Sequence, residues 1–286
     1  MTTITRWLCL TAILLSTFAA DSFALVQQSN RTVDLSNLRH IAQSSLIYAS
    51  DHNGQLPAAT DIWSYAGMLA ERGGLEEARM WMSRIDPAYP HFNPDTTILT
   101  TSSTHPRVLT PEFKETKPAY AVPLGKLNDK MPATTPVAWT RGLQSNGTWA
   151  KHSPYGSDGG GYIAFIGGNV MFYKNLGATP ATGELTRFDG QGPTNNVLEA
   201  LPPGTRIGEY IPTTEEQTAW AAAPRELTTS REDHSTLIGL VILWLPFVGF
   251  SVYRFINMRP NAFTLLLWPL IITILLFILM PTVARC

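Results

Sequence analysis

The chain has 286 residues, with 21 lysines and arginines against 22 aspartates and glutamates, and charged residues make up 15% of it. This near-neutral balance, with 44% hydrophobic residues, excludes a wholly disordered chain and a basic nucleic-acid-binding protein. The two cysteines, Cys9 and Cys286, lie near opposite ends of the sequence. Neither a disulfide framework nor a thiolate zinc site is therefore expected between them.

The first residues have the pattern of a secretory signal peptide. Arg6 precedes an apolar run, and small residues follow at Ala20 and Ala24. We expect residues 1–24 to be a signal peptide, or an N-terminal anchor if they are retained.

Three helices are predicted next. From Leu35 to Ala49 apolar residues recur at three- and four-residue spacing, with Asp34 placed to cap the helix and Asn53-Gly54 placed to end it. The same spacing predicts a helical pair over residues 61–72 and 75–85.

Four strand-like segments follow, at residues 119–124, 135–141, 161–167 and 169–175. The last two are separated only by a turn at Gly167-Gly168, which predicts a tight hairpin. An N-terminal helix packed on a small antiparallel sheet gives an α+β domain, which we place at residues 25–176.

Residues 177–235 are predicted to form an extension and a membrane tether, because their glycine and proline content argues against a continuous core. Within this segment we expect a short strand near residues 205–210 and a short helix near 214–222. Thr214 and Gln217 have the spacing of a capping box at the start of that helix.

The C-terminal region contains two long apolar runs without a charged side chain. These runs extend from Thr236 to Tyr253 and from Ala262 to Ala284. They predict transmembrane helices at residues 236–256 and 262–284, joined by a loop at 257–261. The connection RFINMRPN (254–261) carries Arg254 and Arg259 and no acidic residue, so the positive-inside rule places it in the cytoplasm. The large domain is then expected on the extracytoplasmic side.

No catalytic constellation is visible in the sequence. The histidines lack the spacing of a metal pair, and the segment Tyr155–Gly159 is not a G-x-S-x-G motif. The turn Asp51–Gly54 resembles the start of a calcium loop but lacks its closing glutamate, so calcium has no support and no cofactor or metal ligand is predicted. We predict a non-enzymatic protein, although a hydrolase with a noncontiguous site stays an open alternative.

Aromatic residues offer candidate contacts with a partner. We expect Trp149 and Tyr155 to be exposed interface residues, because tryptophan and tyrosine concentrate binding energy in protein interfaces. Trp139 is a further candidate contact residue, but it lies on a predicted strand, so packing in the core is favoured at least as much as contact with a partner.

Several of these segments together carry a family resemblance. The sequences NLRHIAQSSLIYASDHNGQLP, AYAV, TPVAWTR and SDGGGYIAFIGGNVMFYKNL occur in this order. They resemble the pilin-like and pseudopilin-like proteins of type II secretion in planctomycete and verrucomicrobial bacteria, over about residues 34–176. The start, TRWLCLTAILL, departs from that family in having neither a Gly-Phe processing site nor an early glutamate.

The resemblance implies a pilin-like domain in a bacterium, re-anchored through its C-terminal hairpin in the inner (cytoplasmic) membrane. The expected function is a non-enzymatic role in envelope or secretion-associated protein contacts. The expected partners are the lipid bilayer and envelope or secretion-system proteins, and not nucleic acid. The alternative is a periplasmic ligand-binding or sensor domain coupled to the transmembrane hairpin.

Overall fold

The computed structural model describes residues 29–101, 106–156, 160–177 and 183–223. All of them belong to the first of two compact units, Met1–Thr228. Across these described ranges no helix has both the length and the apolar character needed to span a membrane. The predicted segments 1–24, 236–256, 257–261 and 262–284 lie outside the described residues.

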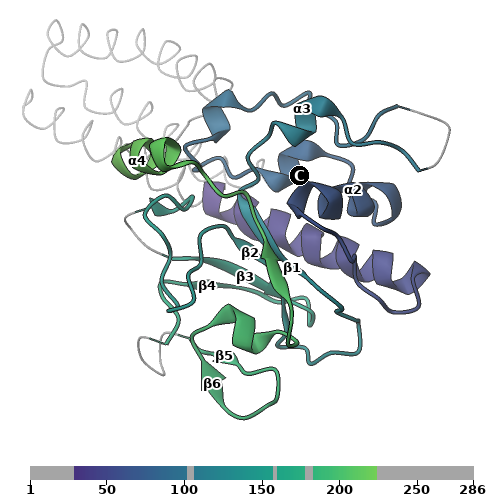
Figure 1. Cartoon of the computed structure of the whole chain (residues 1–286), viewed down its shortest axis with the longest axis vertical. Coiled ribbons are helices and arrows are strands. Elements are labelled where there is room, and N and C mark those ends of the chain that lie inside the picture. The colour runs from purple at the N-terminus through teal and green to yellow at the C-terminus, as the bar shows by residue number, and fades with distance from the viewer. Residues whose placement is uncertain (1–28, 102–105, 157–159, 178–182, 224–286) are drawn as a thin grey trace, which may run out of the picture. The chain divides into compact units, whose positions relative to one another are not determined.

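The described residues form an α+β domain, as predicted from the sequence (Figure 1). Its main sheet is antiparallel and has the strand order β4-β3-β2-β1-β7. These strands are β1 (Tyr120–Leu124), β2 (Pro136–Thr140), β3 (Gly161–Phe165), β4 (Val170–Tyr173) and β7 (Arg206–Gly208). The four predicted strand segments correspond to β1–β4, so this prediction is confirmed.

The predicted hairpin joins β3 to β4. Gly161 pairs with Tyr173 and Ala164 with Val170, and Gly168 has a φ of 82° in the turn between the strands. Glycine adopts this left-handed conformation without the steric cost that a side chain would bring. Every residue of β1, β2 and β3 is buried, because both faces of the sheet centre are covered.

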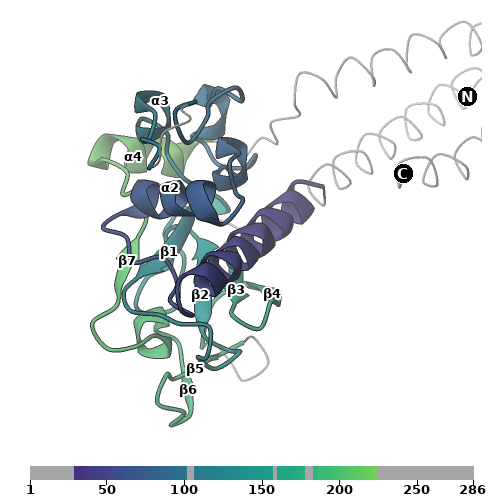
Figure 2. The ribbon, with the colours of Figure 1, turned by 90° about the vertical axis from the view of Figure 1, so that its right-hand side faces the viewer.

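Residues 29–51 form the N-terminal helix, which lies against the sheet with α2 beside it (Figure 2). The predicted stop is confirmed, since Asn53 and Gly54 have φ values of 53° and 78° and turn the chain out of the helix. The predicted cap is wrong. The backbone is already helical at residue 29, and Asp34 lies inside the helix on its buried face.

Of the predicted helical pair, only the first member forms. Helix α2 (Ile62–Arg72) begins at its N-cap Asp61, whose Oδ1 accepts a 2.7 Å hydrogen bond from the backbone N–H of Ser64. The second segment contains only a 3₁₀ turn, η1 (Ala78–Trp81). Glu77 is extended there and forms a β-bridge with Thr97, so a tertiary contact replaces the first helical turn.

The segment expected to be an extension is partly built into the domain. Strand β7 pairs with β1, and the side chains of Leu185, Val197 and Leu201 join the hydrophobic core, so the expectation of no continuous core there is corrected. The predicted short strand and helix are present as β7 and α4 (Thr214–Ala222). The capping box lies one residue earlier than predicted, on Thr213 and Glu216.

The remaining described elements are short. They are η2 (Tyr89–His91), α3 (Pro111–Lys114), β5 (Leu185–Thr186), β6 (Pro193–Thr194) and η4 (Val197–Ala200).

Candidate functional site: two linked polar networks

The first network is centred on the carboxylate of Asp34, on the N-terminal helix. Asp34 is 1% exposed, and three hydroxyl groups donate hydrogen bonds to it. Ser83 Oγ lies 2.7 Å from Oδ2, Tyr155 Oη 2.8 Å from Oδ2, and Tyr120 Oη 2.8 Å from Oδ1. The donors come from a loop, a second loop and strand β1, so Asp34 ties the helix to three separate parts of the chain.

Burial decides the protonation chemistry of this network. Loss of hydration raises the pKa of Asp34 to about 6, even though the three hydroxyl donors act to lower it. Burial and the nearby carboxylate also raise the pKa of Tyr120 and of Tyr155 above that of an ordinary tyrosine. Near neutral pH the network is therefore an ionised carboxylate that accepts from three neutral hydroxyl groups.

A short segment links this network to a second one. Asn37 Nδ2 lies 3.2 Å from both the carbonyl oxygen of Met82 and the hydroxyl of Tyr120. Ser83 then follows Met82, and its carbonyl oxygen accepts a 3.0 Å hydrogen bond from the backbone N–H of Asp86.

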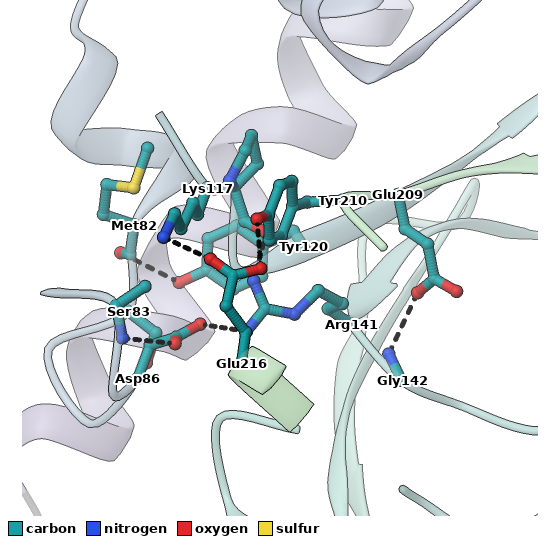
Figure 3. Close-up of polar contacts among 12 residues, drawn as sticks. Met82, Ser83, Asp86, Lys117, Tyr120, Arg141, Gly142, Glu209, Tyr210 and Glu216 are labelled. Carbon is teal, nitrogen blue, oxygen red and sulfur yellow. Dashed lines mark hydrogen bonds and ion pairs between the residues drawn. The ribbon is translucent and has the colours of Figure 1, made fainter. Parts of the chain in front are cut away.

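The second network is centred on Arg141, which directly follows β2 and is fully buried. Its Nη2 lies 2.8 Å from Oδ2 of Asp86, and its Nη1 donates a 2.9 Å hydrogen bond to the carbonyl of Pro118 (Figure 3). Within the described part of the chain, its Nε has no hydrogen-bond partner. A buried guanidinium without its carboxylate would be strongly destabilising, so this pair fixes the loop of Asp86 against the end of β2.

Helix α4 covers the outer side of Arg141. The indole ring of Trp220 has its centroid 4.8 Å from the guanidinium carbon, which is a cation–π contact. Glu216, one helical turn earlier, forms an ion pair with Lys117 and accepts a 2.7 Å hydrogen bond from Tyr210 Oη (Figure 3). Partial burial would raise the pKa of Glu216, but these contacts outweigh it and lower the pKa to about 2.

The sheet explains why these side chains meet. Lys117 precedes β1, Arg141 follows β2 and Tyr210 follows β7. These three strands are adjacent and antiparallel, so the three residues lie at the same end of the sheet. At this end of the sheet the carboxylate of Glu209 accepts a 2.9 Å hydrogen bond from the backbone N–H of Gly142, and burial raises the pKa of Glu209.

The two aromatic residues that the sequence predicts to be exposed lie in the interior. Trp149 is 7% exposed and its Nε1 lies 3.4 Å from the carbonyl oxygen of Thr140, while Tyr155 is 5% exposed and donates to Asp34. The prediction that they are exposed is wrong, because Trp149 packs against Gly161 and the hydroxyl of Tyr155 is bonded to the buried carboxylate of Asp34. Trp139 is also fully buried, on β2.

The charged groups at the centres of both networks are enclosed by the domain. Asp34, Asp86 and Arg141 are at most 3% exposed, so a substrate has no access to them in this conformation. A hollow of about 230 Å³ lies elsewhere, between α2 and residues 97–101, and its cation Arg107 is already paired with Glu71 and Glu76. No cluster of three or more metal-ligating side chains occurs among the residues that the structure describes.

The sequence contains a signal for the first network that the spacing of apolar residues alone does not reveal. Asp34, Asn37 and Ser45 occupy the same helix face as Leu38 and Ile41, and all five are buried. A polar residue at a core position requires an internal partner, so this pattern points to a buried hydrogen-bond network without identifying its members.

No family model, no curated protein and no solved structure matches this chain.

Proposed function

We propose that this protein is a non-enzymatic, membrane-anchored extracytoplasmic protein whose pilin-like domain makes protein contacts in the envelope or in a secretion-associated assembly. The observation that carries the proposal is the packing of helix 29–51 on the antiparallel sheet. The helix exit and the β3–β4 hairpin are the same segments in which the sequence resembles pseudopilins, and they adopt the helix and hairpin that this resemblance implies.

The chemistry of the polar networks supports a non-enzymatic role. Their charged groups are enclosed and paired, which suits them to hold the helix and loops in one register. The best-attested use of buried polar groups is this kind of structural specificity.

Membrane anchoring is supported by the sequence. The apolar runs at 236–253 and 262–284 each have the length needed to cross a bilayer, and Arg254 and Arg259 in the connection between them orient it toward the cytoplasm. The domain before them then lies outside the cytoplasm.

The decisive experiment measures topology and processing together. The mature chain is analysed by mass spectrometry, and intact spheroplasts are treated with protease to test access to residues 29–223. We expect the domain to be digested from outside, whereas an epitope inserted in the loop 257–261 is protected until the membrane is opened. A protected domain in intact spheroplasts would overturn the proposal.

Protein contacts are tested by photocrosslinking from the N-terminal helix. Ile47 is 53% exposed on this helix and is the natural position for a photoreactive residue, with exposed Ser50 as the matched polar position. We expect crosslinks to envelope proteins from position 47 that exceed those from position 50. Equal, purely background labelling at both positions would count against a contact through this helix.

A further inference from the structure

The buried face of the N-terminal helix changes in character along its length. In the first turns, residues 29–37, the buried side chains are Asn30, Asp34 and Asn37, and all three are polar. From Leu38 onward the buried face is mainly apolar and belongs to the hydrophobic core. The docking of the first turns therefore depends on hydrogen bonds, whereas the later turns are held by apolar packing.

Three phenols surround the carboxylate of Asp34. Tyr120, on β1, and Tyr155, in the loop after β2, both donate to it. The pKa of Tyr162, on β3, is raised by burial and further by the charge of Asp34, against the opposing charge of Arg31. All three phenols are neutral near neutral pH, so Asp34 is the group of this cluster that gains or loses a proton there.

The charged groups nearby do not neutralise Asp34. Asp86 has the same sign of charge, which acts to raise the pKa of Asp34, and it is itself paired with Arg141. Arg31, one turn earlier on the helix, is exposed, and its guanidinium lies over the ring of Phe172, 5.5 Å from the centroid. Within the described parts of the chain, Asp34 belongs to none of the ion pairs.

The hydroxyl of Tyr120 has two acceptors within reach. Its Oη lies 2.8 Å from Asp34 Oδ1 and 3.5 Å from the carbonyl oxygen of Met82, and it accepts from Asn37 Nδ2 at 3.2 Å. When the carboxylate is charged, the hydroxyl donates to Oδ1. When Oδ1 carries a proton, that O–H can donate to Tyr120 Oη while the phenol turns its own hydrogen toward Met82. The two donors to Oδ2 are unchanged, so one arrangement satisfies both protonation states.

We propose that residues 29–37 are a proton-controlled latch, which is closed when a proton is held between Asp34 and Tyr120 and opens more readily when that proton is lost. With Asp34 neutral, no charge is kept out of water in the closed state. With Asp34 charged, opening returns the carboxylate to water, so undocking costs less free energy. The later turns, packed through Leu38 and Ile41, stay on the sheet in both states.

The pKa of Asp34 supports this direction and sets the size of the effect. Burial raises it from 3.8 to about 6 in the closed state. The contribution of the proton to closure is therefore fully present below about pH 4 and is lost as the pH rises through about 6. Between pH 4.5 and 7.5 the equilibrium constant for opening is expected to increase roughly 25-fold.

Hydrogen exchange of the full chain in micelles tests the latch. Exchange is measured at pH 4.5, 6 and 7.5 and corrected for the intrinsic pH dependence of amide exchange. The amides of residues 33–37 report opening of the latch, and those of β2 and β3 report global unfolding. We expect the roughly 25-fold change at residues 33–37 in the wild type and its loss in Asp34→Asn. Ser45→Ala is the matched control, because it removes a buried hydroxyl from the later turns and should keep the pH dependence.

Infrared difference spectra test where the proton is held. The spectrum at pH 5.5 minus that at pH 7.5 should contain the C=O band of a protonated carboxyl group, which Asp34→Asn lacks. In Tyr120→Phe this band should move to higher frequency, because the acid O–H has lost its acceptor.

Three results would overturn the inference. The first is exchange at residues 33–37 that is as slow as in β2 and β3 at every pH, because the first turns would then not open separately. The second is an opening constant that changes equally with pH in wild type and Asp34→Asn. The third is a carboxyl band that is the same in wild type and Tyr120→Phe. If Asp34→Asn does not fold, the first and third comparisons still decide. The inference goes beyond the proposed function and concerns the domain itself, so its failure leaves the topology result unaffected.

Discussion

Asp34 and Tyr155 are 121 residues apart in the sequence, yet the tyrosine hydroxyl lies 2.8 Å from the aspartate Oδ2 in the interior of the domain. This contact fastens the N-terminal helix to the loop that follows β2. Removing the hydroxyl leaves a buried carboxylate with one donor fewer, and hydrogen bonds to charged groups are worth about 1.5–3 kcal/mol.

Tyr155→Phe is therefore expected to lower the free energy of unfolding by about 2 kcal/mol. Tyr162→Phe is the matched control, because its ring packs against that of Tyr155 but its hydroxyl is not a donor to Asp34. Urea denaturation of the full chain in micelles measures both. Equal losses in the two variants would contradict the assigned role of the Tyr155 hydroxyl.

The pKa of Asp34 predicts a pH dependence of stability. The pKa is raised from 3.8 to about 6 on folding, so the folded state binds this proton more tightly than the unfolded state. Stability from this group is present below about pH 4 and is lost as the pH rises through about 6, by an amount on the order of 3 kcal/mol.

Asp34→Asn removes this titration. We expect wild type to gain stability relative to Asp34→Asn as the pH is lowered from 7.5 to 4.5, measured by urea denaturation at each pH. Ser83→Ala keeps the carboxylate but removes a donor that lowers its pKa, so the pH dependence should remain and move to higher pH. A wild-type minus Asp34→Asn difference that is constant with pH would show that Asp34 does not titrate in this range.

Two glycines of the β3–β4 hairpin are expected to respond differently to a methyl group. At Gly161 a Cβ atom would lie 2.4 Å from Trp149 Nε1 and 2.9 Å from Thr140 Cβ, so Gly161→Ala must displace the indole. Overpacking of this kind costs roughly 1–3 kcal/mol or more. At Gly168 the space is open and only the positive φ opposes the change, at about 1 kcal/mol.

Thermal unfolding of the two alanine variants tests this difference. Gly161→Ala should also shift the tryptophan fluorescence, because Trp149 moves, whereas Gly168→Ala should leave the spectrum unchanged. A Gly161→Ala variant as stable as Gly168→Ala would argue against the close packing of Trp149 on β3.

The buried pair Arg141–Asp86 is suited to a double-mutant cycle. Arg141→Met leaves Asp86 buried and without its cation, and loss of one partner of such a pair costs about 3–5 kcal/mol. Asp86→Asn is expected to be destabilising for the converse reason. The double variant should lose clearly less than the sum of the two single losses, as measured by urea denaturation, because no charge is then left unpaired. Additive losses would mean that the two side chains do not stabilise each other.

Sequence pattern alone determined the parts of this protein that depend on neighbouring residues. Apolar runs bounded by turn residues identified strands β1–β4, and the glycine pair between β3 and β4 identified their hairpin. Helix α2, helix α4 and the stop of the N-terminal helix at Asn53-Gly54 follow from spacing and capping chemistry in the same way.

Only the tertiary structure decided which polar residues work together. Asp34 has the sequence pattern of a cap but is buried, because hydroxyl donors from distant segments compensate the cost of removing its charge from water. Residues 75–85 have helical spacing, yet the bridge from Glu77 to Thr97 competes successfully with the helix. The pairing of β7 with β1 brings α4 to Arg141. Each of these outcomes depends on contacts between residues far apart in the chain, whose desolvation and pairing energies exceed the local preferences that a sequence pattern records.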